Sequence, residues 1–182
     1  MASTIVVGVG NVLFKDEGVG VFAAKYLEQN YALPDDVEII DGATLGFKLM
    51  TYFQDYDHVI ILDTVSVEDA PGSIYRLPAE EMMGLGSYRQ TAHEVEIVEM
   101  LEICSLLEQM AEVTILGIVP KDIEAVEIGL TPELEAHFDE YIDHAVKELA
   151  TLGYPMEKTG DTTLKQISID LIGAYNETRA YA

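Results

Sequence analysis

Three ionisable side chains, Glu17, Asp63 and His93, stand where the chain is expected to leave a strand or to enter a helix. Glu17 follows the apolar run 4–10, Asp63 ends the apolar run 58–63, and His93 directly precedes a segment with helical spacing. Two carboxylates and an imidazole form a mixed oxygen and nitrogen set suited to nickel, zinc, iron or manganese. These residue types therefore allow a metal site, although acidic residues at strand ends and helix starts are also ordinary turn and cap residues.

The elements that must position these residues follow from the apolar pattern. Apolar β-branched runs predict strands, and amphipathic segments between them predict helices. We expect strands at residues 4–10, 37–41, 58–63, 72–77 and 113–119, and helices at 18–31, 45–56, 94–109 and 131–152. Thr131 suits the N-cap of the last helix and Pro132 its first turn. The fold class is therefore α/β, a three-layer, mostly parallel twisted sheet of about five strands with helices on both faces.

The expected strand order places 4–10 between 37–41 and 58–63. The chain then leaves its first strand to one side and returns on the other. In such a sheet, ligands bind in the crevice at the carboxyl ends of the strands that flank this change of direction. Glu17, Asp63 and His93 are expected to converge there.

The composition limits the possible partners. The 182 residues include 10 lysine and arginine against 33 aspartate and glutamate, a formal net charge of −23, while 49% are hydrophobic. We expect one acidic domain over residues 1–182, in which 156–182 is a C-terminal extension that forms a packed helix. The negative charge opposes binding to nucleic acid and membrane surfaces and favours a monomer. A single cysteine, Cys104, and an N-terminus without a basic leader predict a cytoplasmic location.

Two common alternatives are disfavoured by local sequence. The stretch 8–13 approximates the dinucleotide motif GxGxxG, but Leu13 replaces the third glycine, and the acidic pair Asp16-Glu17 follows where phosphate would lie. Cys104 lies on the apolar face of its predicted helix, so a buried structural thiol is favoured over a nucleophile.

Several segments together resemble the hydrogenase maturation endopeptidases, which trim the large subunit of nickel-iron hydrogenases. In chain order they are 8–20 (GVGNVLFKDEGVG), 41–46 (DGATLG), 61–65 (ILDTV), His93-Glu94, 117–121 (GIVPK) and 129–133 (GLTPE). Two departures are Ala43, where the family usually has a second glycine, and Glu96-Ile97, where Gly-Leu is common. The resemblance extends from residue 4 to near residue 150.

The resemblance implies an endopeptidase that removes a short C-terminal extension from a hydrogenase large-subunit precursor after nickel insertion. It also implies that Glu17, Asp63 and His93 bind the metal. The substrate would supply the nickel, and another divalent metal could occupy the isolated protein. Nickel then either takes part in hydrolysis or only positions the scissile bond while a carboxylate such as Asp41 assists. For Asp41 a turn or cap role is the alternative.

The connection 78–92 contains Met82 and Met83. Adaptable methionine-rich surfaces suit protein docking, so this loop is predicted to contact the large subunit, with packing on its own domain as the alternative. A function of another class also stays open, namely a nickel-binding accessory protein that delivers or checks the metal without cutting. The lack of a recognisable nucleophile favours that function, and the lack of His-rich or Cys-rich tracts opposes it.

Overall fold

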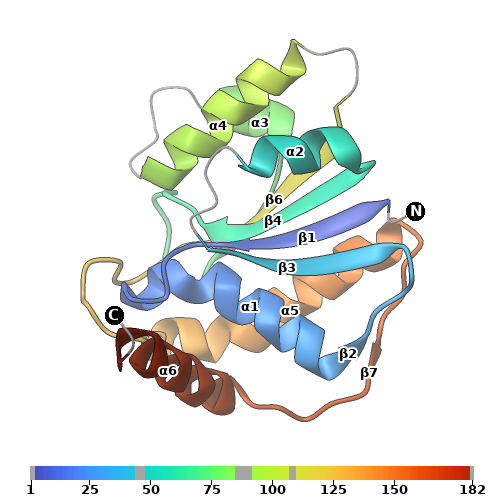
Figure 1. Ribbon diagram of the computed structural model, residues 1–182. Helices are drawn as coiled ribbons and strands as arrows, with labels where there is room; N and C mark the ends of the chain where they lie inside the picture. Colours follow the sequence, from blue (N-terminus) through green and yellow to red (C-terminus); the bar gives the residue numbers. More distant parts are fainter. Residues whose placement is uncertain (1–2, 44–47, 85–91, 107–109, 181–182) are drawn as a thin grey trace.

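A five-stranded sheet forms the middle layer of the molecule (Figure 1). The computed structural model describes the backbone of residues 3–43, 48–84, 92–106 and 110–180, and the side chains of these residues apart from 43, 83–84 and 92–96. In spatial order the strands are β3 (Val37–Ala43), β1 (Thr4–Val9), β4 (His58–Thr64), β6 (Glu112–Ile118) and β5 (Ile74–Pro78). All are parallel to their neighbours except β5, which is antiparallel to β6. The predicted fold class and the predicted start of the strand order are confirmed.

Helices cover both faces of this sheet (Figure 1). On one face lie α2 (Lys48–Asp55), α3 (Ala79–Gly84) and α4 (Ala92–Ser105). On the other face lie α1 (Val19–Asn30) and α5 (Pro132–Thr151), with α6 (Leu164–Ala180) packed outside them on α1. A single turn of 3-10 helix, η1 (Lys15–Gly18), leads directly into α1. Among the helices in the described ranges, none is both long and apolar enough to cross a bilayer.

The strands carry two apolar cores, one on each face of the sheet. In β1, Val6 joins the core beneath α1 and α5, whereas Ile5 and Val7 join the core beneath α2 and α4. All six residues of β1 are buried. The continuous apolar run of this strand follows from that burial, because a parallel strand with helices on both faces has no solvent-facing side.

The edge of the sheet formed by β5 begins after a turn at Gly72, whose φ is 93°. The sequence predicted a short strand here. A short connection, 65–73, leads from the end of β4 to the start of β5, so β5 begins at that edge of the sheet and runs back antiparallel to β6. A separate two-stranded ribbon joins β2 (Tyr31–Ala32) to β7 (Glu157–Lys158), and no sequence pattern predicted it.

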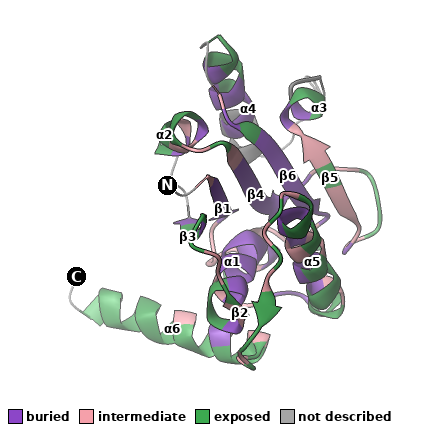
Figure 2. Cartoon of the chain, turned by 90° about the vertical axis from the view of Figure 1, so that its right-hand side faces the viewer, coloured by how far each residue is buried: buried purple, intermediate pink, exposed green. Residues whose placement is uncertain are grey.

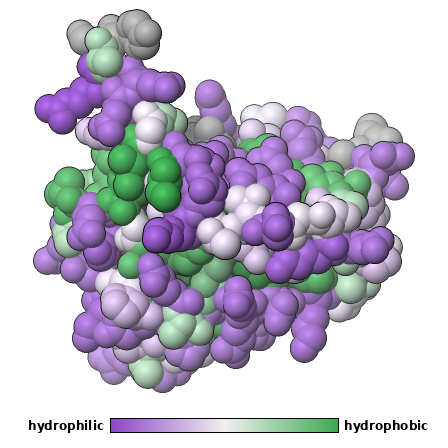
Figure 3. Space-filling view, turned by 90° about the horizontal axis from the view of Figure 1, so that it is seen from below, coloured by the Kyte–Doolittle hydropathy of each residue, from purple (hydrophilic) through white to green (hydrophobic). Residues whose placement is uncertain are grey.

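The C-terminal extension is attached to α1 through Asn30, which is fully buried. The backbone N–H groups of Thr159 and Gly160 donate to the Asn30 carbonyl at 2.7 and 3.1 Å, and the Asn30 side chain bonds both backbone groups of Thr162, at 2.8 and 2.9 Å. Beyond this anchor, α6 contributes Ile167 to the core but is otherwise largely exposed (Figure 2). Seen from below the view of Figure 1, the surface is mostly hydrophilic, with hydrophobic side chains gathered toward the left (Figure 3).

Two segments differ from their predictions. Residues 79–84 form the helix α3 inside the stretch expected to be a loop. Thr131 does stand at the N-cap of α5, with Pro132 in the first turn, but its hydroxyl makes no capping bond to the helix. It donates to Asp16 instead, a contact described below.

Candidate active site

The carboxyl ends of β1 and β4 form the switch point at which the sequence placed the site. Gly8 of β1 lies in register with Asp41 of β3 on one side and with Leu62 of β4 on the other. The start of α1 approaches this edge closely. A Cβ atom on Gly20 would lie 2.0 Å from the Leu62 carbonyl oxygen, so only glycine allows the helix this near to the sheet. As a result η1, which carries Glu17, contacts β4, which carries Asp63.

Asp63 is the penultimate residue of the strand β4 and is 2% exposed. The backbone N–H of Thr64 donates to its Oδ1 atom at 2.7 Å, which orients the carboxylate. Beneath it, the Tyr141 hydroxyl of α5 donates to the carbonyl oxygens of Leu116 at 2.6 Å and of Asp63 at 3.4 Å. Burial raises the pKa of Tyr141 well above its usual range, so this hydroxyl remains a donor. The end of β4 is therefore firmly held.

Glu17 is partly buried on η1, and its backbone packs against the turn that follows β1. Gly10 has a φ of 138°, and a Cβ atom there would lie 1.9 Å from the Glu17 carbonyl oxygen. A Cβ atom on Gly18 would likewise lie only 2.7 Å from the Val12 Cα atom. The glycines of the N-terminal motif thus allow close packing of backbone around Glu17.

Asp16 is the residue of this region that sequence reasoning did not single out. Its carboxylate is fully buried and accepts four hydrogen bonds. Oδ2 accepts from the backbone N–H of Lys121 at 2.9 Å, from that of Asp122 at 3.1 Å and from the Thr131 hydroxyl at 2.8 Å. Oδ1 accepts from the Thr131 N–H at 2.7 Å. In the sequence Asp16 looked like an ordinary acidic residue at a helix start, and its partners are more than 100 positions away.

Lys15 precedes Asp16 and has a left-handed backbone, with a φ of 51°. A residue with a side chain adopts this conformation only where its surroundings impose it. Glu127 holds Lys15 in this conformation. The Glu127 carbonyl accepts the Lys15 N–H at 3.0 Å, and the Glu127 carboxylate pairs with Lys15 Nζ at 2.7 Å. The segment 121–131 is therefore bound to η1 through hydrogen bonds and an ion pair made by Lys15 and Asp16.

Asp41 stands at the carboxyl end of β3, but the structure does not bring it to Asp63. Its carboxylate pairs with Lys25 Nζ of α1 at 3.4 Å. Since side chains alternate along a strand, Asp41 shares the α1 face with Ile39, whereas Asp63 shares the opposite face with Ile61. The two strands are also separated by β1. Any assistance from Asp41 in hydrolysis would therefore have to act across the end of β1.

The remaining predicted site residues lie around α3 and α4. The backbone of His93 belongs to the first turn of α4, and its side chain and that of Met83 lie outside the described residues. Met82 is 4% exposed and packs in the core with residues of α4, as in the alternative reading in which this connection packs on its own domain. Its side chain is therefore part of the core rather than of a docking surface. Among the described side chains, no three His, Cys, Asp or Glu residues are grouped closely enough to hold a metal ion.

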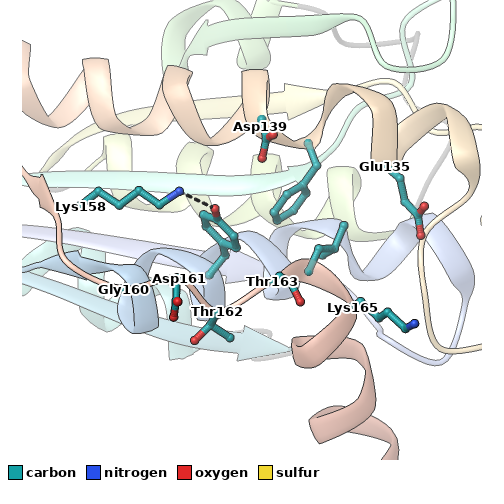
Figure 4. Close-up of a pocket in the computed structure, with 11 residues that line it drawn as sticks. Glu135, Asp139, Lys158, Gly160, Asp161, Thr162, Thr163 and Lys165 are labelled. Carbon is teal, nitrogen blue, oxygen red and sulfur yellow. Dashed lines mark hydrogen bonds between the residues drawn. The ribbon is translucent and has the colours of Figure 1, made fainter.

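Two cavities lie apart from Glu17 and Asp63. One, of about 600 Å³, is lined by part of the segment 121–131 and by Glu133. The other, of about 520 Å³, lies between α1, α5 and the start of α6, and Figure 4 shows Lys158 reaching the Tyr26 hydroxyl at its wall, at 3.2 Å. This second cavity mixes Lys158 and Lys165 with Asp139 and Asp161, so it has no uniform charge.

A three-layer α/β sheet with two acidic residues at its switch point defines a class of small α/β proteins that bind ligands at the strand ends. The family model described as hydrogenase maturation protease matches residues 21–148. The hydrogenase 2 maturation protease of Escherichia coli is 36% identical over 151 residues, covering 82% of this chain and 92% of that protein. The solved structure of the E. coli hydrogenase maturating endopeptidase HybD superposes with a TM-score of 0.80 at 34% identity, covering 87% of this chain and 99% of that one.

The chain therefore belongs to the hydrogenase maturation protease family, and it is an endopeptidase by class. The hydrogenase expression/formation protein HupD of Thiocapsa roseopersicina is 28% identical over 182 residues, covering 96% of this chain and 82% of that protein. The match to the E. coli protease covers less of the chain, so the two relatives differ in how much of the present sequence they share.

Proposed function

We propose that this chain removes the C-terminal extension of a nickel-iron hydrogenase large-subunit precursor after nickel has been inserted. Membership of the maturation protease family supports the reaction. The observation that carries the choice of site is the contact of η1 with β4 at the switch point, because it brings Glu17 and Asp63 to one edge of the sheet.

In this proposal Glu17, Asp63 and His93 recognise the nickel that the precursor carries. Two carboxylates and an imidazole suit a borderline divalent ion, so the donor set fits. A metal bound there would polarise a carbonyl or lower the pKa of a water molecule. The protein's own part is to hold the carboxylates in place, through the Thr64 N–H on Asp63 and the packed glycines around Glu17.

The scissile bond would be positioned by the nickel that these residues hold, and positioning alone contributes much to catalysis. The Cys104 thiol is an unsuitable nucleophile, because it is fully buried and burial raises its pKa. Water is therefore the proposed nucleophile, with a carboxylate such as Asp41 as one candidate to assist it.

A processing assay tests this function. Purified protein is mixed with nickel-loaded precursor, and the intact mass of the precursor is followed for wild type, His93→Ala and the matched control His144→Ala, a helical histidine of α5. Loss of a C-terminal peptide with wild type and with the control, but slowed at least about tenfold by His93→Ala, supports the proposal. If wild type binds the precursor and leaves it intact, a non-proteolytic accessory role replaces it.

A further inference from the structure

We propose that Asp16 is a positioning residue of this site, which holds the segment 121–131 against η1 and thereby fixes the direction of Glu17. This inference rests on the function proposed above in one respect, the role of Glu17 in nickel recognition. The attachment of η1 itself follows from the contacts of Asp16.

The chemistry of the four bonds requires a carboxylate. All four partners of Asp16 are donors, namely three backbone N–H groups and one hydroxyl, and a carboxylate offers acceptors on both oxygens. An asparagine of the same size would turn an NH2 group toward at least one of these donors. Since the site is fully buried, water cannot relieve that mismatch.

The backbone next to Asp16 is pinned by the same segment. The Asp16 N–H donates to the Asp122 carbonyl at 3.0 Å, and the Lys15 N–H donates to Glu127. Together with the carboxylate, these contacts fix the two residues that precede Glu17, one of them in a left-handed conformation. The Glu17 N–H then donates to the Phe14 carbonyl at 3.0 Å, closing the turn.

Glu17 is held from the other side by the turn after β1. The Gly10 backbone lies so close to the Glu17 carbonyl that no side chain fits between them. Glu17 therefore has little freedom to move while Asp16 keeps the segment 121–131 in place. Loss of the Asp16 carboxylate would release one of the two supports.

The test compares Asp16→Asn with Glu124→Gln, which also removes one negative charge from this region but changes an exposed side chain. Hydrogen exchange of the backbone amides reports whether η1 and the segment 121–131 have loosened. Affinity is measured for nickel-loaded and for nickel-free precursor. Asp16→Asn is expected to speed exchange in both segments but not in β1 and β4, and to weaken binding of the nickel-loaded precursor by about 10- to 100-fold, leaving the nickel-free affinity unchanged.

A merely structural role would lower both affinities together or neither, and either result overturns the proposal. Unchanged exchange in η1 also overturns it, whatever the precursor does. If wild type shows no preference for nickel-loaded precursor, the proposed function fails, while the exchange data still decide whether Asp16 holds η1.

If Asp16→Asn does not fold, Thr131→Val is a second variant that tests the same contact. Valine has the shape of threonine but lacks the hydroxyl that donates to Asp16 Oδ2, so one bond of the four is lost. The same changes are expected in the same direction but smaller. Unchanged exchange in η1 of Thr131→Val would contradict the proposal. Where Asp16→Asn does fold, the threonine change should add little in the double variant, because the two residues act through one contact, and full additivity would also contradict the proposal.

Discussion

Arg76 of β5 and Glu148 of α5 form a bidentate ion pair, in which the Nε to Oε2 and Nη2 to Oε1 distances are 2.8 Å each. The Glu148 side chain is 10% exposed and that of Arg76 is 48% exposed. This pair joins the antiparallel edge strand to the helix that also carries Tyr141, whose hydroxyl supports the end of β4.

Arg76→Ala should therefore destabilise the fold by more than a surface ion pair would. The change leaves a nearly buried carboxylate without its donors, and we expect a loss of about 1–3 kcal/mol in the free energy of unfolding. Urea denaturation followed by circular dichroism measures it. Lys147→Ala, at the exposed neighbouring position, is the control and should cost less than about 0.5 kcal/mol. Equal effects of both substitutions would contradict this reading of the pair.

Gly20→Ala tests the close approach of α1 to the sheet. Its methyl group would overlap the Leu62 carbonyl, so α1 must move away, and we expect a loss of at least about 1–3 kcal/mol in stability. Gly173→Ala in α6 is the matched helical control, because its Cβ would have no neighbour within 4 Å. That substitution should stabilise the protein by about 0.5–1 kcal/mol. Thermal unfolding of both variants distinguishes local crowding from a general effect of alanine.

Asp63→Asn should impair precursor processing without a large loss of stability. The amide oxygen can still accept the Thr64 N–H, but the negative charge is gone, so we expect processing of nickel-loaded precursor to fall by about 10-fold or more. Asp57→Asn, an exposed position just before the other end of β4, is the control. The measurement is the initial rate of peptide release by mass spectrometry. Normal processing by Asp63→Asn would remove this residue from the proposed site.

Cys104 should be inert toward thiol reagents while the protein is folded. Its side chain is fully buried, and desolvation raises its pKa above the ordinary value of 9.0. Labelling with a disulfide reagent at about pH 8 is expected only after denaturation, since the thiolate is the reactive form. Rapid labelling of the native protein would show that the helix opens.

The same shift gives the sign of a pH effect on stability. The folded protein holds the thiol proton more tightly than the unfolded chain does. The contribution of the Cys104 thiol to stability is therefore fully present below the pKa of this thiol in the unfolded chain. It is lost as the pH rises through the pKa of the thiol in the folded protein. Above about pH 9, wild type should lose stability more steeply than Cys104→Ala. Parallel pH curves for the two proteins would show that the thiol does not contribute.

Sequence predicted the features that depend on local pattern. The buried strands β1, β4 and β6 appear as nearly unbroken apolar runs, and their alternation with helices is enough to indicate a parallel sheet and the edge that carries Glu17 and Asp63. Local sequence does not reveal the role of Asp16, because the groups that donate to it come from a distant segment of the chain. For the same reason, local sequence indicates that the Thr131 hydroxyl caps its own helix, whereas in the structure it donates to Asp16.

Met82 shows a different limit of pattern reading. Two adjacent methionines followed by a glycine are compatible with an exposed loop and equally with a short helix that has one buried side. Only the position of α4 decides, because Met82 fills space against it. Composition gives no information about that neighbour.

Asn30 concentrates the attachment of the C-terminal extension in one side chain and one carbonyl. The bonds of its side chain need both an amide donor and an amide acceptor, and no other residue of that length offers the pair. In evolutionary terms, a single codon at the end of α1 controls two of the four hydrogen bonds made here, while the backbone carbonyl, the β2–β7 ribbon and Ile167 would still hold the extension after its substitution.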